Sequence, residues 1–117
     1  MPTKTDLNER IAKVKGWTQD DTLLWVMSDP PHPTEWRDPY GIPEMLFDWV
    51  GTLEGVAELL QELYATCHCV AFEPFGCDKW RCSGTREEVN EAYEYESDRT
   101  RPGDCIAMAW LGIFGGA

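Results

Sequence analysis

Five of the eight prolines in this 117-residue chain lie in one stretch, SDPPHPTEWRDPYGIPE, residues 28–44. Each proline removes a backbone donor and biases the residue before it away from the helical region. The stretch therefore predicts an irregular loop. Trp36 and Tyr40 lie within it, and aromatic rings in a loop commonly fold back over the core or form the lip of a binding site.

Two segments show the spacing of amphipathic helices. Residues 5–17 begin with Asp6 and Glu9 at capping-box spacing, and Gly16 is a natural stop. A second helix is predicted over residues 48–66, and its expected apolar face consists of Leu53, Val56, Leu60 and Leu63. Another face of this helix carries a row of carboxylates at four-residue spacing, which comprises Glu54, Glu58 and Glu62.

A third helix is predicted from Thr100, near its N-cap, to Gly115 and Gly116, with Pro102 in its first turn. Its expected buried stripe is formed by Ile106, Ala109, Trp110 and Ile113. Residues 22–28 are a short apolar run that predicts a strand or a buried extended segment. Residues 85–98 are acidic, and their pattern leaves a helical turn and a strand both open.

Four of the five cysteines lie in the stretch TCHCVAFEPFGCDKWRC, residues 66–82. The stretch alternates like a strand on both sides of Pro74 and Gly76, which supply turn chemistry, so it predicts a β-hairpin. In the first strand, the period of two would place Cys67, Cys69 and Ala71 on one face.

These cysteines could bind a metal, act as nucleophiles or fill a covered sheet. Structural zinc usually takes ligands from paired C-x-x-C knuckles, a spacing absent here, although Cys67, Cys69 and Cys82 could still meet across the hairpin. His68 would point away from its neighbouring cysteines, and His32 lies in the proline stretch, so no Cys–His pair is indicated. We predict no metal, no cofactor and no catalytic residue. The thiols expected to fill a covered sheet are Cys67, Cys69, Cys77 and Cys82.

The order helix, strand, helix, hairpin, helix predicts an α+β fold, a three-layer α/β/α sandwich with about three helices on both faces of a small antiparallel sheet. The length predicts a single domain over residues 1–117. No apolar run approaches the length of a membrane span, and MPTKTDLNER lacks the apolar core of a signal peptide, so we expect a cytoplasmic protein.

Five features carry a resemblance to a known family. They are LNERIAKVKGW at the start, Trp25 followed by the proline stretch with Pro39 and Tyr40, the central leucine helix, the strand pair around Trp80, and CIAMAWL in the final helix. In these features, which span nearly the whole chain, the sequence resembles the phage ABA sandwich domain of small bacteriophage and prophage proteins. The resemblance implies a three-layer sandwich and a phage accessory protein without family-wide catalytic residues. The cysteine-rich hairpin and the acidic residues 87–98 depart from the expected family pattern.

Ten Lys and Arg against 21 Asp and Glu give a formal net charge of −11, which opposes nucleic-acid binding and favours a partner with a basic surface. We expect a non-enzymatic phage accessory protein, an anti-CRISPR-like inhibitor that binds a basic host protein in the host cytoplasm. A merely solvated acidic face is the alternative. The expected partner-binding residues are Glu87, Glu88, Glu91, Tyr93, Glu94, Tyr95, Glu96 and Asp98.

A second hypothesis is a sponge for a signalling nucleotide, in which aromatic rings stack on the base and Arg37 or Arg99 lies near a phosphate. The ligand-binding residues expected under this hypothesis are Trp25, Trp36, Arg37, Tyr40 and Trp49. A minor structural role in the phage particle is a third possibility. The sequence does not indicate the oligomeric state.

Overall fold

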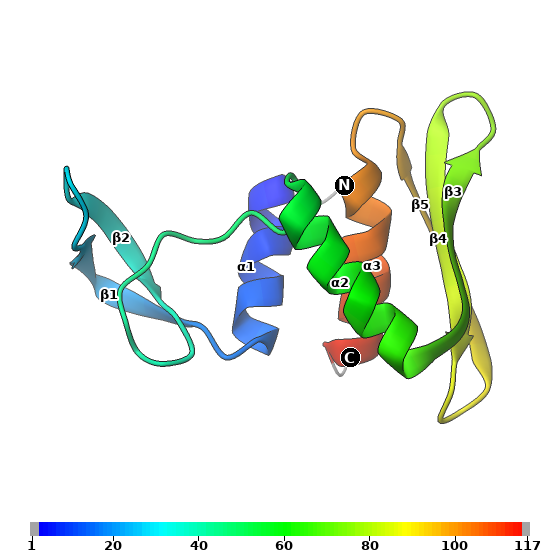
Figure 1. The fold of residues 1–117 in the computed structure, drawn as a ribbon, viewed down its shortest axis with the longest axis horizontal. Coiled ribbons are helices and arrows are strands. Elements are labelled where there is room, and N and C mark those ends of the chain that lie inside the picture. The colour runs from blue at the N-terminus through cyan, green and yellow to red at the C-terminus, as the bar shows by residue number, and fades with distance from the viewer. Residues whose placement is uncertain (1–2, 116–117) are drawn as a thin grey trace.

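The structure is a computed structural model that describes residues 3–115 (Figure 1). Within these residues it has three helices and two antiparallel sheets, so the predicted α+β class is confirmed. The elements follow in the order α1 (Lys4–Val14), β1 (Thr18–Val26), β2 (His32–Arg37), α2 (Leu53–Thr66), β3 (Cys67–Phe75), β4 (Lys79–Arg86), β5 (Glu91–Asp98) and α3 (Pro102–Phe114).

The helices lie together between the two-stranded sheet β1–β2 and the three-stranded sheet β3–β4–β5, as Figure 1 shows. Helix α3 packs along β4 and β5, and both α1 and α2 pack against α3. The expected sandwich has helices on both faces of one sheet. Here the outward face of the three-stranded sheet carries ion pairs, such as Lys79 with Glu96 and Arg81 with Glu94, and these charges stay at the solvent side rather than under a helix layer.

Helix α1 begins with a capping box, but the predicted partners, Asp6 and Glu9, are wrong. The backbone N–H of Asp6 donates to Thr3 Oγ1 at 3.1 Å, and the N–H of Thr3 donates to Asp6 Oδ2 at 3.3 Å. The helix ends before Gly16, whose φ of 96° is a conformation that glycine adopts readily. Leu7 and Ile11 are fully buried against the other helices.

Helix α2 begins at Leu53, later than predicted, because residues 48–52 form a loop and Thr52 is the N-cap. Thr52 Oγ1 accepts the N–H of Gly55 at 3.1 Å. Gly55 packs so closely on Trp49 that a Cβ there would lie 2.4 Å from the Trp49 Cα. This approach fixes the rotation of the helix. Leu59 and Leu63 are therefore buried, whereas Leu53, which was expected on the apolar face, is exposed.

The proline stretch is not entirely irregular, because β2 lies within it. This strand pairs with β1, and Pro33 lies opposite Trp25. Proline is tolerated since β2 is not a central strand of a full sheet. The predicted strand at residues 22–28 is confirmed as β1, which starts earlier, at Thr18, and contains no buried residue.

The predicted hairpin is confirmed as β3–β4, which pairs from Cys67–Arg86 to Phe75–Lys79. A register shift between His68 and Ala71 interrupts β3, and Cys69 has a φ of 54° there. The expected shared face of Cys67 and Cys69 is therefore wrong, because a bulge resets the alternation. The acidic residues 91–98 form β5, which pairs with β4 along its length.

Helix α3 supplies the centre of the core. Its N-cap is Arg101, one residue after the predicted Thr100, and Gly115 is its C-cap. The predicted stripe is largely confirmed, since Ile106, Ala109 and Trp110 are buried and Ile113 is partly buried. Gly116 lies outside the described residues. Within residues 3–115, no helix has both the length and the apolarity needed to cross a bilayer.

Candidate protein-binding arm and the pocket at its base

Residues 18–45 form an arm, which consists of β1, β2 and the segment that follows them, and which projects from the helices (Figure 1). One buried ring, Trp36, lies in the hydrophobic core cluster and anchors the arm. An isolated two-stranded sheet is at best marginally stable in water. The arm is therefore the part of the fold that gains most from further contacts.

The arm exposes large apolar side chains. On β1 and just after it, Leu23, Trp25 and Met27 are 63%, 52% and 91% exposed. Tyr40 is 87% exposed and is held by a turn, because Asp38 Oδ1 accepts the N–H groups of Tyr40 and Ile42, each at 2.9 Å. A cluster of exposed apolar groups on a soluble domain typically marks an interaction site.

The arm is also acidic. It contains six carboxylates and one arginine, Arg37. The guanidinium of Arg37 is engaged within the arm: its Nε donates to Asp20 Oδ2 at 3.2 Å and its NH1 donates to the carbonyl of Gly41 at 2.9 Å. Hydrogen bonds from Thr22, followed by that from Arg37, lower the pKa of Asp20. The arm thus combines exposed apolar groups with a net negative charge.

The acidic residues 87–98 are not gathered on one surface. The rings of Tyr93 and Tyr95 lie on the face of the sheet that meets the helices. Tyr93 lies over Gly84 of the neighbouring strand β4, and the Tyr95 hydroxyl lies beside Gly112 of α3. Burial raises the pKa of Tyr93 above its ordinary value. The three carboxylates between the two rings and after them point outward, and each has a local partner. Glu94 pairs with Arg81, Glu96 pairs with Lys79, and Asp98 accepts hydrogen bonds from Thr100.

At the β4–β5 turn, Glu87 Oε1 lies 3.7 Å from His68 Nε2, whereas the carboxylates of Glu88 and Glu91 have no hydrogen bond or ion pair among the described residues. The turn is therefore a small acidic surface without an exposed aromatic anchor. It lies at the opposite end of the molecule from the arm (Figure 1).

The aromatic residues of the nucleotide hypothesis do not form one site. Trp36 and Trp49 are buried, whereas Trp25 and Tyr40 are exposed on the arm. Trp49 contacts Trp17 and Phe47, neither of which the hypothesis includes. Because the rings do not stack on one another, the structure offers no shared platform for a base.

A pocket of about 480 Å³, the base pocket, opens between the arm, the end of α1 and the start of α2. Three rings line it: Trp17 and Trp49 meet edge to face at 5.7 Å and 82°, and Phe47 meets Trp49 at 5.2 Å and 70°. The arm adds Pro39 and Met45 to the wall. Aromatic and apolar walls with a few polar groups are typical of binding pockets.

The polar lining of the base pocket is predominantly acidic. Lys15 is its one cation, against the carboxylates of Asp38, Glu44, Glu54 and Glu58. The Nζ of Lys15 is already paired: it lies 2.5 Å from Glu62 Oε1 and 3.2 Å from Glu58 Oε2, which lines the pocket, and 5.1 Å from the centre of the Trp110 ring. The expected carboxylate row on α2 is thus neutralised in part by the lysine that caps the C-terminus of α1.

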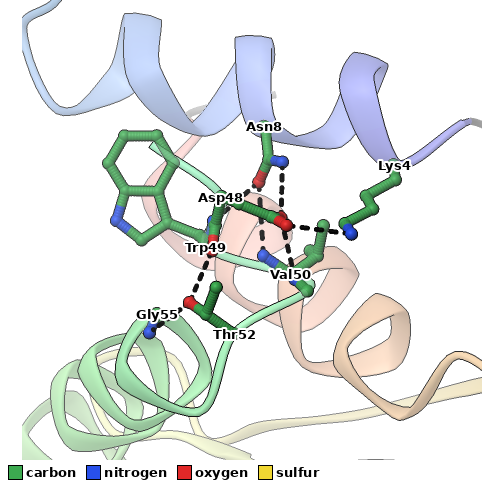
Figure 2. Close-up of polar contacts among 8 residues, drawn as sticks. Lys4, Asn8, Asp48, Trp49, Val50, Thr52 and Gly55 are labelled. Carbon is green, nitrogen blue, oxygen red and sulfur yellow. Dashed lines mark hydrogen bonds and ion pairs between the residues drawn. The ribbon is translucent and has the colours of Figure 1, made fainter. Parts of the chain in front are cut away.

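Trp49 is held in place by the loop at residues 48–52, and Figure 2 shows how Asn8 binds this loop to α1. Asn8 Oδ1 accepts the N–H groups of Trp49 at 2.9 Å and Val50 at 3.2 Å, and Asn8 Nδ2 donates to Asp48 Oδ1 at 2.9 Å. The side chain of Trp49 is held separately, because its indole N–H donates to Glu58 Oε2 at 2.5 Å. The backbone of Trp49 is therefore held by α1 and its ring by α2.

Asp48 is the second polar centre of this loop. Its Oδ2 lies 2.9 Å from Lys4 Nζ, and its Oδ1 accepts the N–H of Gly51 at 2.9 Å (Figure 2). Partial burial opposes ionisation of this carboxyl, but the hydrogen bonds from Lys4, Asn8 and Gly51 outweigh it and lower the pKa of Asp48. The loop is therefore held by a charged group as well as by an amide.

The five cysteines divide into buried and exposed thiols. Cys67, Cys82 and Cys105 are buried, and burial raises the pKa of Cys82 to about 12. Cys69 and Cys77 are exposed, so the prediction that all four hairpin thiols fill a covered sheet is wrong for these two. Within residues 3–115, no group of three or more His, Cys, Asp or Glu side chains is arranged to hold a metal ion.

The sequence reasoning missed Asn8, Trp17 and Phe47. A usable signal was the sequence FDW at residues 47–49, in which two rings flank a carboxylate, together with Trp17 directly after the glycine that ends α1. A scan against models of protein families and searches of curated proteins and solved structures returned no match to the chain.

Proposed function

We propose that the protein is a non-enzymatic binding protein whose arm attaches to a basic surface of another protein. One observation carries the proposal: the arm projects from the helices and exposes Leu23, Trp25 and Met27 within a segment of six carboxylates and one arginine. Tryptophan and tyrosine supply much of the binding energy in protein interfaces, and the surrounding charge selects the partner.

The charge of the whole chain supports a basic partner of a different sequence. With a formal charge of −11, two copies of the chain repel each other, and the phosphate backbone of nucleic acids is repelled as well. A basic protein surface is attracted and also offers apolar groups to cover the arm.

The arm has stronger support as the main contact than the acidic β4–β5 turn. The turn has carboxylates, but Tyr93 and Tyr95 face the helices, so it lacks exposed rings that could act as anchors. A secondary contact through Glu87, Glu88 and Glu91 remains a prediction. The setting also remains a prediction: a phage-encoded inhibitor of a host defence, in the host cytoplasm, is the role that the resemblance supports.

The test is affinity capture from a bacterial lysate with the full chain and two variants. The arm variant carries Leu23→Ser, Trp25→Ser and Met27→Ser, and the turn variant carries Glu87→Gln, Glu88→Gln and Glu91→Gln. We expect the wild type and the turn variant to retain a basic protein that the arm variant loses. Raising the salt concentration should weaken the capture, since charge attraction contributes to it. Equal capture by the arm variant, or capture of acidic proteins alone, would contradict the proposal.

A further inference from the structure

We infer that the base pocket receives the guanidinium group of an arginine side chain from the partner. The inference rests on the proposed function for the origin of that side chain. Its residues are nevertheless distinct from the exposed strand of the arm, so the pocket can be tested separately with a small probe.

The walls of the base pocket suit a planar cation. Trp17 and Phe47 each meet Trp49 edge to face, and all three rings line the space. Trp17 and Phe47 are only partly buried, so they offer ring surface to an incoming group. A guanidinium is planar, stacks on aromatic faces and is attracted by the negative face of the ring. The volume of about 480 Å³ is in the range of small-molecule sites, so an entire side chain can enter.

The charges of the base pocket favour a cation as well. Glu44 and Glu54 are exposed at its rim, and their carboxylates have no hydrogen bond or ion pair among residues 3–115. Glu58 is occupied by the indole N–H of Trp49 and by Lys15, and its charge still contributes to the field. A guanidinium between Glu44 and Glu54 could donate to both while it stacks on a ring.

Arginine fits better than lysine because two features coincide here, aromatic rings in the wall and two carboxylates, Glu44 and Glu54, from different segments of the chain. A guanidinium offers five donors in a plane, whereas an ammonium is a compact and strongly hydrated charge. Lys15 illustrates the contrast. Its compact ammonium is already paired with two neighbouring carboxylates of α2, Glu58 and Glu62, and lies over Trp110.

The first test titrates the full protein with N-acetyl-arginine N-methylamide and follows the indole N–H signals of Trp17 and Trp49 by nuclear magnetic resonance. The matched probe is the citrulline analogue, which has the same shape and no charge. We expect saturable shifts of both indole signals with the arginine probe and none with citrulline. Equal responses to the two probes, or no response of these signals to either, would overturn the inference. A stronger response to the lysine analogue would overturn the choice of arginine.

The second test uses variants. Glu44→Gln combined with Glu54→Gln removes both unpaired carboxylates, and Glu88→Gln combined with Glu91→Gln removes the same charge at the distant turn. Since exposed ion pairs contribute little each, we expect the pocket variant to weaken arginine binding by about fivefold and the turn variant to leave it unchanged. If both variants weaken arginine binding equally, the cause is the net charge of the protein, and the inference that the base pocket is the site is wrong.

The outcomes separate the two proposals. If the arginine probe binds the pocket but no basic protein is captured through the arm, the proposed function fails and the pocket stands. If the arm captures a basic protein while the probe leaves Trp17 and Trp49 unchanged, the pocket fails and the proposed function stands.

Discussion

The side-chain oxygen of Asn8 accepts the backbone N–H of Trp49 at 2.9 Å, although the two residues are 41 positions apart in the chain. Asn8 is 6% exposed and also accepts the N–H of Val50. We predict that Asn8→Ala lowers the free energy of unfolding by about 2–3 kcal/mol, because two buried donors lose their acceptor. Urea unfolding measures the change. Gln19→Ala, which removes an exposed hydrogen bond, should have a much smaller effect, and equal losses would contradict the role of Asn8.

Asp48 predicts a pH dependence of stability. Its pKa in the folded protein is lowered from the ordinary value of 3.8, so the carboxylate stabilises the fold above that value. This contribution is lost as the pH falls through the folded pKa, below 3.8. We expect Asp48→Asn to be less stable than the wild type at neutral pH, and the difference to shrink as the pH falls below the ordinary value of 3.8. Thermal unfolding at several pH values measures it, and a constant difference would contradict the assignment.

The thiols should fall into two classes. Cys69 and Cys77 are exposed, whereas Cys67, Cys82 and Cys105 are buried. We predict that a maleimide modifies two thiols of the native protein and five after unfolding in denaturant. Mass spectrometry of the labelled protein counts the groups. A variant with Cys69→Ser and Cys77→Ser should remain unlabelled in the native state, and rapid labelling of that variant would show that the hairpin opens.

The arm should open more readily than the core. Strand β1 contains no buried residue, whereas most of α3 is buried. Hydrogen exchange depends on the free energy of local opening, so we predict that amides of β1 exchange much faster than those in the middle of α3. A basic partner that covers the arm should slow the exchange of β1 selectively. Equal protection of β1 and α3 in the free protein would contradict this account.

Local patterns predicted the elements whose causes are local. The apolar spacing of α1 and α3 and the turn at Gly76 indicated two helices and a hairpin. The start of α2 was missed, because the loop at residues 48–52 is held by Asn8, a residue far away in sequence. Strand β2 was missed because the prolines of this stretch predicted a loop. The strand pairs only with β1 in its sheet, and an edge strand of this kind tolerates proline.

The base pocket was outside the reach of sequence patterns. Its rings come from Trp17, Phe47 and Trp49, and its carboxylates come from both the arm and α2, so only the folded arrangement brings them together. The inward rotation of Tyr93 and Tyr95 was similarly hidden. Their alternation with carboxylates indicated a strand, but not which face of it would meet the helices.

The outer edge of β2 is already occupied by the chain itself. The N–H of Glu44 donates to the carbonyl of Trp36 at 3.1 Å, and Thr34 Oγ1 donates to the carbonyl of Glu44 at 2.7 Å. Within the arm, an extended peptide from another molecule therefore finds a fully open strand edge only along β1. If two copies pair through β1, neither arm has a second fully open edge for another copy, which protects the exposed apolar residues from seeding fibrous growth.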